Sequence, residues 1–311
     1  MTTANHETLR LLNLPIFKDV DSLSEVINID TGRLNTLIEN PYKFYKRYEI
    51  KKKSGDSRLI MQPNKEMKAI QAWILRNILD KLSPSYHATA FNQGVGLIDN
   101  VIPHKYNRYF LCVDIEDFFP SIKTFRVKRI FSVAGFSKNA SSILARLCTC
   151  KNGLPQGGVT SPSLSNLVCA HLDKRISGLV AKRNIIYTRY ADDFTFSSNN
   201  PAKLHLTYPI IKKIIEDEGF LLNDSKTRYM GPKAGCHVTG LVKNSSAPGF
   251  SIGKKKKIQM RAIMHNLVAK KKITSKYSSV ESIDGWLAYL KSVDESSHLG
   301  MKKYWDQLKA K

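Results

Sequence analysis

Apolar residues recur at intervals of three and four in several parts of the chain, which predicts amphipathic helices there. The clearest helix is expected at residues 64–82, where apolar side chains share one face and Lys and Arg lie opposite. Residues 1–50 are also expected to be helical, with Asp21 and Asp30 placed to cap two of the helices. Further helices are expected at 125–147, with a break near Gly135, and at 161–176, 203–219, 258–267, 279–292 and 295–309.

Four other stretches have the residue types and spacing typical of strands. Residues 51–63 are expected to form two short strands around a Ser-Gly-Asp turn. An apolar strand is expected at 110–114, and a further short strand at 237–242. Residues 185–197 are expected to form two strands joined by a tight turn at Ala191-Asp192.

The turn of the 185–197 hairpin carries two adjacent carboxylates, Asp192 and Asp193. Neighbouring carboxylates repel each other and lose hydration on burial, so an apolar hairpin carries such a pair at a cost. One interpretation is a turn that uses Asp for local hydrogen bonds. The alternative is a divalent-metal site, which needs at least one more carboxylate. Asp114, at the end of its own strand, would supply it, although a lone acid in that place more often caps a helix.

A glycine-containing loop precedes the helix expected at 161–176. It contains Leu154-Pro155-Gln156-Gly157-Gly158, and glycines allow a ligand to approach the backbone closely. No Gly-Lys-Ser/Thr follows, so this is not a Walker loop. A glycine loop before a helix is by itself a weak signal of function.

The charge of the chain predicts a polyanionic partner. Its 311 residues carry 49 Lys and Arg against 26 Asp and Glu, a net charge of +23. Nucleic acid is the first candidate partner, and an anionic membrane surface is the second. Two lysine runs flank the helix at 258–267 and would lie along a phosphate backbone, or would form a solvated face that binds nothing. These lysines are Lys254, Lys255, Lys256, Lys257, Lys270, Lys271 and Lys272.

Compartment and redox state follow from what the sequence lacks. No segment is apolar enough to span a bilayer, and the N-terminus has no basic-then-apolar signal pattern, so a cytoplasmic protein is expected. The five cysteines are odd in number and form no Cys-x-x-Cys pair. Reduced thiols are therefore expected, in preference to a disulfide framework or a zinc site.

The order of these motifs closely resembles that of the reverse transcriptases, over roughly residues 50–245. The chain has a basic hairpin, a strand ending in Asp114, the Leu154-Pro155-Gln156-Gly157 loop, Tyr190-Ala191-Asp192-Asp193, Gly219 followed by Lys226, and a basic helical end. Two further marks resemble the retron reverse transcriptases of bacteria. One is Asn-Ala-x-x-His, which stands here as Asn100 to His104 with Val101 in place of Ala. The other is Val-Thr-Gly, intact at Val238, Thr239 and Gly240.

The resemblance implies an α+β right-hand polymerase with an antiparallel palm sheet. A helical N-terminal extension would cover residues 1–50. The fingers would comprise 51–105 and 123–165, and the palm 106–122 and 166–245. A basic helical thumb would cover 246–311.

The resemblance also implies roles for individual residues. Asp114, Asp192 and Asp193 would hold two Mg²⁺ ions, or Mn²⁺ as a substitute, with the backbone oxygen of Ile115 as a further ligand. Lys226 would protonate the leaving pyrophosphate. Lys53 and Arg58 would contact the triphosphate, Gln156 the nucleotide or template, and Phe119 the sugar. The residues that would contact RNA or primer are Asn100, His104, Val238, Thr239, Gly240 and the two lysine runs.

Phe119 bears on the choice of nucleotide. A bulky ring under the sugar would clash with a ribose 2′-hydroxyl and favour deoxynucleotides, whereas the alternative interpretation of Phe119 is a core aromatic. For retrons the resemblance implies copying of a structured noncoding RNA into single-stranded DNA that stays associated, primed from the 2′-hydroxyl of a guanosine. It further implies antiphage defence with a separate effector protein. The alternatives are a group II intron or other non-retron enzyme, an RNA-dependent RNA polymerase, and an inactive RNA-binding scaffold.

Overall fold

The computed structural model describes residues 5–51, 55, 57–232, 235–244, 248–269, 277 and 279–310. The chain forms two compact units, each made of three separate stretches of sequence. The first unit comprises Met1–Asn92, Ile115–Gly178 and Ile210–Asn223. The second comprises Gln93–Asp114, Leu179–Pro209 and Asp224–Lys311.

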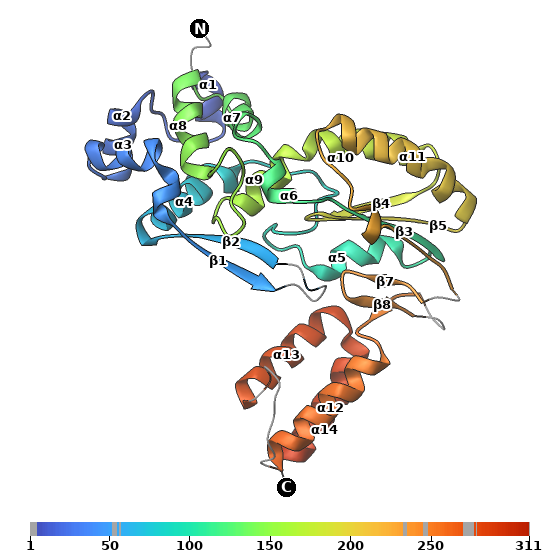
Figure 1. Ribbon diagram of the computed structural model, residues 1–311. Helices are drawn as coiled ribbons and strands as arrows, with labels where there is room; N and C mark the ends of the chain where they lie inside the picture. The colour runs from blue at the N-terminus through green and yellow to red at the C-terminus, as the bar shows by residue number, and fades with distance from the viewer. Residues whose placement is uncertain are drawn as a thin grey trace. The chain divides into compact units, whose positions relative to one another are not determined.

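The described part of the first unit is helical apart from one two-stranded hairpin (Figure 1). Two further helices, α10 (Ala170–Ala181) and α11 (Pro201–Asp217), run from one unit into the other. The elements of the first unit are α1 (His6–Leu11), α2 (Val20–Ile27), α3 (Thr31–Glu39), η1 (Pro41–Phe44), β1 (Tyr45–Lys51), β2 (Ser57–Pro63), α4 (Lys65–Asn77), η2 (Leu79–Lys81), α6 (Phe118–Ser121), α7 (Thr124–Val133), α8 (Lys138–Cys148) and α9 (Ser161–Val168).

The N-terminal helices differ in detail from the sequence-based expectation. Asp30 caps α3 by accepting the Arg33 N–H at 2.8 Å, as predicted. The cap of α2 is Asp19, two residues before the predicted Asp21, and it accepts the Ser22 N–H at 2.9 Å. Residues 45–50, expected to be helical, form β1, because β1 pairs along its whole length with β2. The hairpin predicted at 51–63 is therefore longer than expected, and its first strand takes in residues 45–50.

The second unit is built on a four-stranded antiparallel sheet with strand order β4-β5-β3-β6. The central strand β3 pairs with β5 on one side and β6 on the other. A separate three-stranded sheet has the order β7-β8-β9. The elements before the C-terminal helices are α5 (Leu97–Val101), η3 (Ile102–His104), β3 (Tyr109–Asp114), β4 (Ile186–Tyr190), β5 (Asp193–Ser198), η4 (Asp224–Lys226), β6 (Arg228–Met230), β7 (His237–Val238), β8 (Leu241–Lys243) and β9 (Phe250–Ser251).

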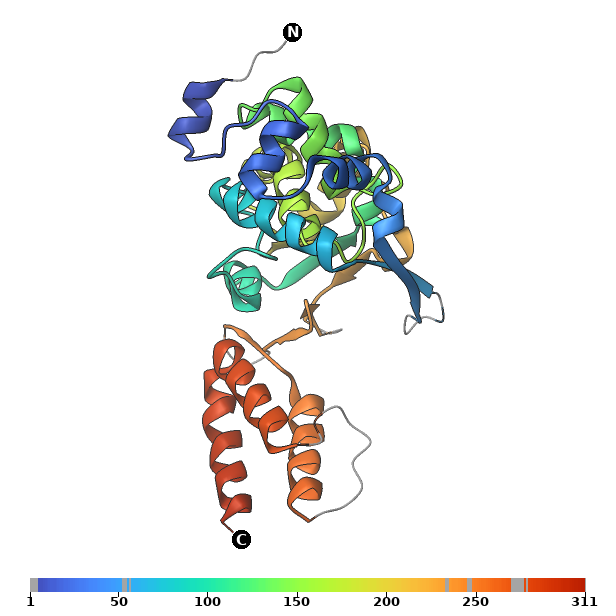
Figure 2. The ribbon, with the colours of Figure 1, turned by 90° about the vertical axis from the view of Figure 1, so that its left-hand side faces the viewer.

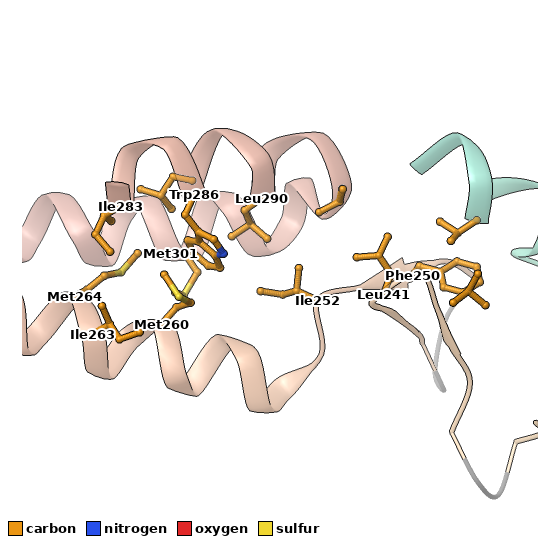
Figure 3. Close-up of a cluster of buried hydrophobic side chains, with 14 of the residues drawn as sticks. Leu241, Phe250, Ile252, Met260, Ile263, Met264, Ile283, Trp286, Leu290 and Met301 are labelled. Carbon is orange, nitrogen blue, oxygen red and sulfur yellow. The ribbon is translucent and has the colours of Figure 1, made fainter. Parts of the chain in front are cut away.

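Three helices close to the predicted ones follow β9: α12 (Lys254–Val268), α13 (Val280–Val293) and α14 (Glu295–Lys309) (Figures 1 and 2). Their apolar faces form a core in which α12 and α13 point side chains toward each other (Figure 3). Trp305 of α14 is almost fully buried, and its indole N–H donates to Asp284 Oδ1 at 3.0 Å. The labelled residues of this core include Met260, Ile263, Met264, Ile283, Trp286, Leu290 and Met301.

All five cysteines are buried with free thiols, and the reduced state expected from the sequence stays a prediction. Among the residues that the structure describes, no helix combines the length and the apolar character that crossing a bilayer requires.

Candidate active site

The β4–β5 hairpin has the tight turn predicted from sequence. Tyr190 pairs with Asp193, which leaves Ala191 and Asp192 as the two turn residues. Ala191 has φ 57°, the left-handed conformation that two-residue hairpins favour. Arg189, fully buried, donates from Nη1 to the Ala191 carbonyl at 3.2 Å. The buried Arg189 guanidinium therefore helps to fix the conformation of the turn beside the two carboxylates.

The pairing of β3 with β5 places Asp114 directly opposite Asp193. Side chains directly opposite in an antiparallel pair lie on the same face, with Cβ atoms about 5 Å apart. Asp114 is 7% exposed, so this carboxylate is largely withdrawn from water. Two acids from strands far apart in sequence are thus brought together at the end of the central strand pair.

This juxtaposition changes the acidity of Asp193. The pKa of Asp193 is raised to about 6, chiefly by burial and also by the charges of Asp192 and Asp114, while Lys226 and Arg228 act in the opposite direction. A buried group of like charges favours any cation that can neutralise it.

Lys226 and a small cavity complete the local environment of the two acids. Lys226 Nζ donates to Asp114 Oδ1 at 2.7 Å. A cavity of about 250 Å³ lies beside them. It is lined by Cys112, Val113, Asp114, Asp193, Ser225, Lys226 and Arg228.

The donor set suits a hard divalent cation. Carboxylate oxygens are the ligands that Mg²⁺ and Mn²⁺ prefer. Burial raises the pKa of Cys112 to about 11, which keeps this neighbouring thiol neutral and a poor ligand. Among the described residues, no three His, Cys, Asp or Glu side chains converge closely enough to hold an ion together. Of the three predicted acids, Asp114 and Asp193 lie opposite each other, and Asp192 lies in the adjoining turn.

The predicted nucleotide contacts lie in the first unit. Arg58 is exposed on β2, and Lys53 lies outside the described residues. Gln156 accepts the Met61 N–H at its carbonyl at 2.8 Å, so its loop is tied to β2. Gly157 has φ 119°, and a Cβ there would lie 3.0 Å from the Met61 carbonyl oxygen. Glycine is thus required where the loop meets the hairpin.

Phe119 and Ile115 follow Asp114 in the chain. Ile115 is buried and forms a strand bridge to Leu222. Phe119 is half-buried at the start of α6, and its ring lies 5.4 Å from that of Phe118 and 6.4 Å from that of Phe91. Partial exposure leaves the Phe119 ring available for contact with a substrate.

Asn100 and His104, the polar residues of the Asn-Ala-x-x-His mark, are fully buried, which does not fit the direct RNA contact expected of their side chains. His104 lies 2.6 Å from Ser197 Oγ through Nδ1 and 2.9 Å from Thr188 Oγ1 through Nε2. The Thr188 hydroxyl donates to the Asn100 carbonyl at 3.0 Å, so His104 Nε2 is the donor to Thr188. Burial lowers the pKa of His104 to about 3, so the imidazole is neutral. It ties η3 to both strands of the β4–β5 hairpin.

The Val-Thr-Gly mark forms a turn between β7 and β8, where a single strand was expected. Val238 is 1% exposed, so its side chain packs inward. Thr239 is half-buried with φ 45°, and its hydroxyl accepts from Asn100 Nδ2 at 3.3 Å. Gly240 is exposed. The two retron marks, 139 residues apart, therefore meet in this structure.

The predicted basic surface is described only in part. Lys254 and Lys255 are exposed on α12, and Lys256 and Lys257 are half-buried. The second run, Lys270, Lys271 and Lys272, lies outside the described residues.

Sequence reasoning missed two residues of this site. Arg228, the first residue of β6, lines the cavity, and its nearness to Lys226 in the sequence was an available signal. Arg189 supports the turn, and no pattern in the sequence distinguishes a buried arginine from an exposed one.

Together, the antiparallel sheet, the facing acids at the end of its central strand pair and the adjoining lysine define a nucleic-acid polymerase of the right-hand class. The chain belongs to the reverse transcriptase family: residues 50–264 match the family described as Reverse transcriptase (RNA-dependent DNA polymerase). It is therefore an RNA-directed DNA polymerase of a family that uses divalent metal ions.

Comparison with individual proteins agrees with this assignment. Retron Ec86 reverse transcriptase of Escherichia coli is 38% identical over 305 residues, which cover 97% of this chain and 93% of that protein. Retron Mx162 reverse transcriptase of Myxococcus xanthus is 32% identical over 281 residues, 80% of this chain and 58% of that protein. Telomerase from Candida tropicalis, solved with a fragment of telomeric RNA, superposes with a TM-score of 0.52 at 14% identity. That match covers 88% of this chain and 59% of the telomerase chain, and it shows the shared fold alone.

Proposed function

We propose that this chain is the reverse transcriptase of a retron, which copies a structured noncoding RNA into single-stranded DNA that stays associated with it (msDNA). The similarity to retron enzymes over 97% of the chain supports this. The observation that carries the catalytic part of the proposal is the register of β3 and β5, which sets Asp114 opposite Asp193.

Asp114 and Asp192 are proposed to hold two Mg²⁺ ions, with Asp193 as a third ligand or close support and the Ile115 carbonyl as a further one. When bound, the ions supply activation of the attacking hydroxyl and stabilisation of charge on the leaving group. The raised pKa of Asp193 supports a cation here, because a divalent ion relieves the repulsion among the three acids.

Lys226 is proposed to give a proton to the leaving pyrophosphate. In the reaction, a primer hydroxyl oxygen bonds to the α-phosphorus of the nucleotide while the bond from that phosphorus to pyrophosphate breaks. The leaving oxygen needs a proton, and the Lys226 ammonium lies beside the proposed metal ligand Asp114.

Nucleotide choice and RNA binding are proposed for residues outside the acid cluster. Phe119 excludes the ribose 2′-hydroxyl, and Arg58 with Gln156 contacts the incoming nucleotide. The exposed lysines of α12 bind the RNA backbone, in keeping with the net charge of +23. Antiphage defence with a separate effector protein is part of the proposal through the retron relatives alone.

The test begins with the nucleic acid that the protein carries when purified from its host. Sequencing is expected to find a short DNA joined to an RNA, and the RNA should template extension with dNTPs and Mg²⁺. The Asp192→Asn and Asp193→Asn double variant should lose extension, while Asp306→Asn, on an exposed part of α14, should not.

Other outcomes would favour the alternatives. RNA without attached DNA, copied efficiently, favours an intron-type or other non-retron enzyme. Efficient extension with ribonucleotides favours an RNA polymerase. RNA binding without extension by the wild-type protein favours a scaffold.

A further inference from the structure

Phe91 is a half-exposed aromatic residue on a strained backbone. Its φ is 63°, the left-handed region that a residue with a Cβ rarely adopts. Phe91 is 49% exposed, whereas its neighbours Ala88, Thr89 and Ala90 are 3%, 7% and 1% exposed. The segment is therefore buried except at the one side chain that is large and apolar.

A buried asparagine holds this segment in place. Asn166 of α9, 1% exposed, donates from Nδ2 to the Ala90 carbonyl at 2.7 Å and to Asn92 Oδ1 at 3.1 Å. Asn92 in turn donates from Nδ2 to the Ala88 carbonyl at 2.6 Å. Unfavourable backbone conformations persist only where the surroundings impose them, and they gather at functional sites. These hydrogen bonds hold the backbone on both sides of Phe91 and so impose its unfavourable φ.

The strained residue contacts Phe119. The two rings lie 6.4 Å apart with planes tilted by 44°, within the range of favourable aromatic pairs. Phe119 also contacts Phe118, which is 4% exposed and packs 6.0 Å from the ring of fully buried Phe220. The Phe119 ring thus has two aromatic neighbours, a core phenylalanine and the half-exposed Phe91.

We propose that Phe91 is a positioning residue for nucleotide specificity: it holds the Phe119 ring where that ring excludes a ribose 2′-hydroxyl. The inference rests on the proposed role of Phe119. Steric exclusion needs a ring that cannot turn aside, and packing against neighbouring side chains fixes a rotamer. Without Phe91, Phe119 keeps its chemistry but loses one of its two aromatic neighbours.

The experiment measures kcat/KM for a dNTP and for the matching rNTP with full-length protein on its own RNA. Phe91→Ala should lower the dNTP preference by about tenfold, the size expected for one pocket interaction. Phe91→Tyr keeps the ring and should restore the preference. Phe91→Gly relieves the strained φ and tests whether discrimination is lost without a stability defect. Phe125→Ala, which removes a 69% exposed aromatic on α7, is the matched control.

Phe119→Ala separates the two hypotheses. If Phe119→Ala loses discrimination while Phe91→Ala and Phe91→Gly keep the wild-type ratio, the role of Phe91 is overturned and the proposed function stands. If Phe119→Ala leaves the ratio unchanged, the proposed gate fails, and the inference about Phe91 fails with it. If Phe91 acts only through the Phe119 ring, the Phe91→Ala/Phe119→Ala double variant should prefer dNTP over rNTP no less than Phe119→Ala alone does.

Discussion

The Lys226 ammonium nitrogen lies 2.7 Å from Oδ1 of Asp114, so the proposed proton donor is ion paired with a proposed metal ligand. The two side chains differ in exposure, 53% for Lys226 and 10% for Asp114. The lysine therefore reaches the acids from the solvent side of the cavity. A pyrophosphate that leaves the site towards solvent would pass this ammonium.

Removing the Lys226 ammonium should slow the chemical step more than it weakens nucleotide binding. Lys226→Ala is expected to lower kcat by about a hundredfold or more, with a small change in KM for dNTP, because a general acid acts in the transition state. Lys226→Arg should rescue little, since a guanidinium keeps its proton. Single-nucleotide incorporation measures both constants, with Lys138→Ala on α8 as an exposed-lysine control. A raised KM with unchanged kcat would show that Lys226 only binds phosphate.

The acid cluster should make the metal-free protein less stable as pH rises. The pKa of Asp193 is about 6 in the folded protein against 3.8 for an ordinary aspartate. The folded state therefore holds a proton that the unfolded state has released, and stability falls from about pH 4 to pH 6, by on the order of 2–3 kcal/mol. Asp193→Asn should remove this loss and raise Tm at pH 8 in EDTA.

Thermal unfolding with and without Mg²⁺ provides the control. Added Mg²⁺ should stabilise the wild-type protein at pH 8 more than Asp193→Asn, because the ion neutralises the same repulsion. Asp306→Asn should behave as wild type throughout. Equal stabilisation of both proteins by Mg²⁺ would contradict a metal site at these acids.

His104 should make stability depend on pH in the opposite direction. Burial lowers the pKa of His104 to about 3. An unfolded histidine takes up a proton below about pH 6.5, so stability is lost as pH falls through that value, by about 2 kcal/mol at pH 5. His104→Phe should be less sensitive between pH 7 and 5. It should also cost about 2–4 kcal/mol at pH 8, because Thr188 and Ser197 each lose one hydrogen-bond partner.

RNA affinity distinguishes this packing role from direct recognition. Because His104 is fully buried, His104→Phe should alter RNA affinity only as far as it unfolds the protein. Chemical-denaturation curves and filter binding at the same pH give the two quantities. A large loss of affinity in fully folded protein would show that His104 acts in RNA recognition after all.

Local patterns predicted much of this fold. The turn at Ala191-Asp192 followed from alternation on both sides, and the helices at 279–292 and 295–309 from their apolar spacing. Each depends on residues near one another in sequence. The α+β right-hand architecture followed from the order of the motifs, which only a family resemblance could interpret.

What the sequence could not supply depends on distant partners. The register that pairs Asp114 with Asp193 joins residues 79 apart, and no local rule sets it. The burial of Asn100 and His104 depends on β4 and β5, so two polar residues that suggested RNA contact prove to be internal hydrogen-bonding groups. The strained φ of Phe91 likewise depends on Asn166, which lies 76 residues after Ala90.

The lysine run that begins α12 should divide into two functions. Lys254 and Lys255 are exposed, whereas Lys257 Nζ lies 3.4 Å from Oδ2 of Asp294, whose side chain is 5% exposed. Asp294 also caps α14 by accepting the Ser297 N–H at 3.1 Å. Lys257 therefore pairs with a carboxylate inside the helical bundle, whereas the exposed Lys254 and Lys255 can bind phosphate.

Salt-dependent RNA binding tests this division. Wild-type affinity should fall steeply with salt, and Lys254→Gln/Lys255→Gln should weaken binding and lower the slope of log affinity against log salt by about 1.5, near 0.7–0.9 for each phosphate that a lysine no longer neutralises. Its Tm should not change. Lys257→Gln should show the reverse, with a nearly unchanged slope and a stability loss of about 1–2 kcal/mol, because it leaves a buried carboxylate without its cation. If all three lysines lower the slope equally, Lys257 exchanges Asp294 for RNA, and the ion pair is not a fixed part of the fold.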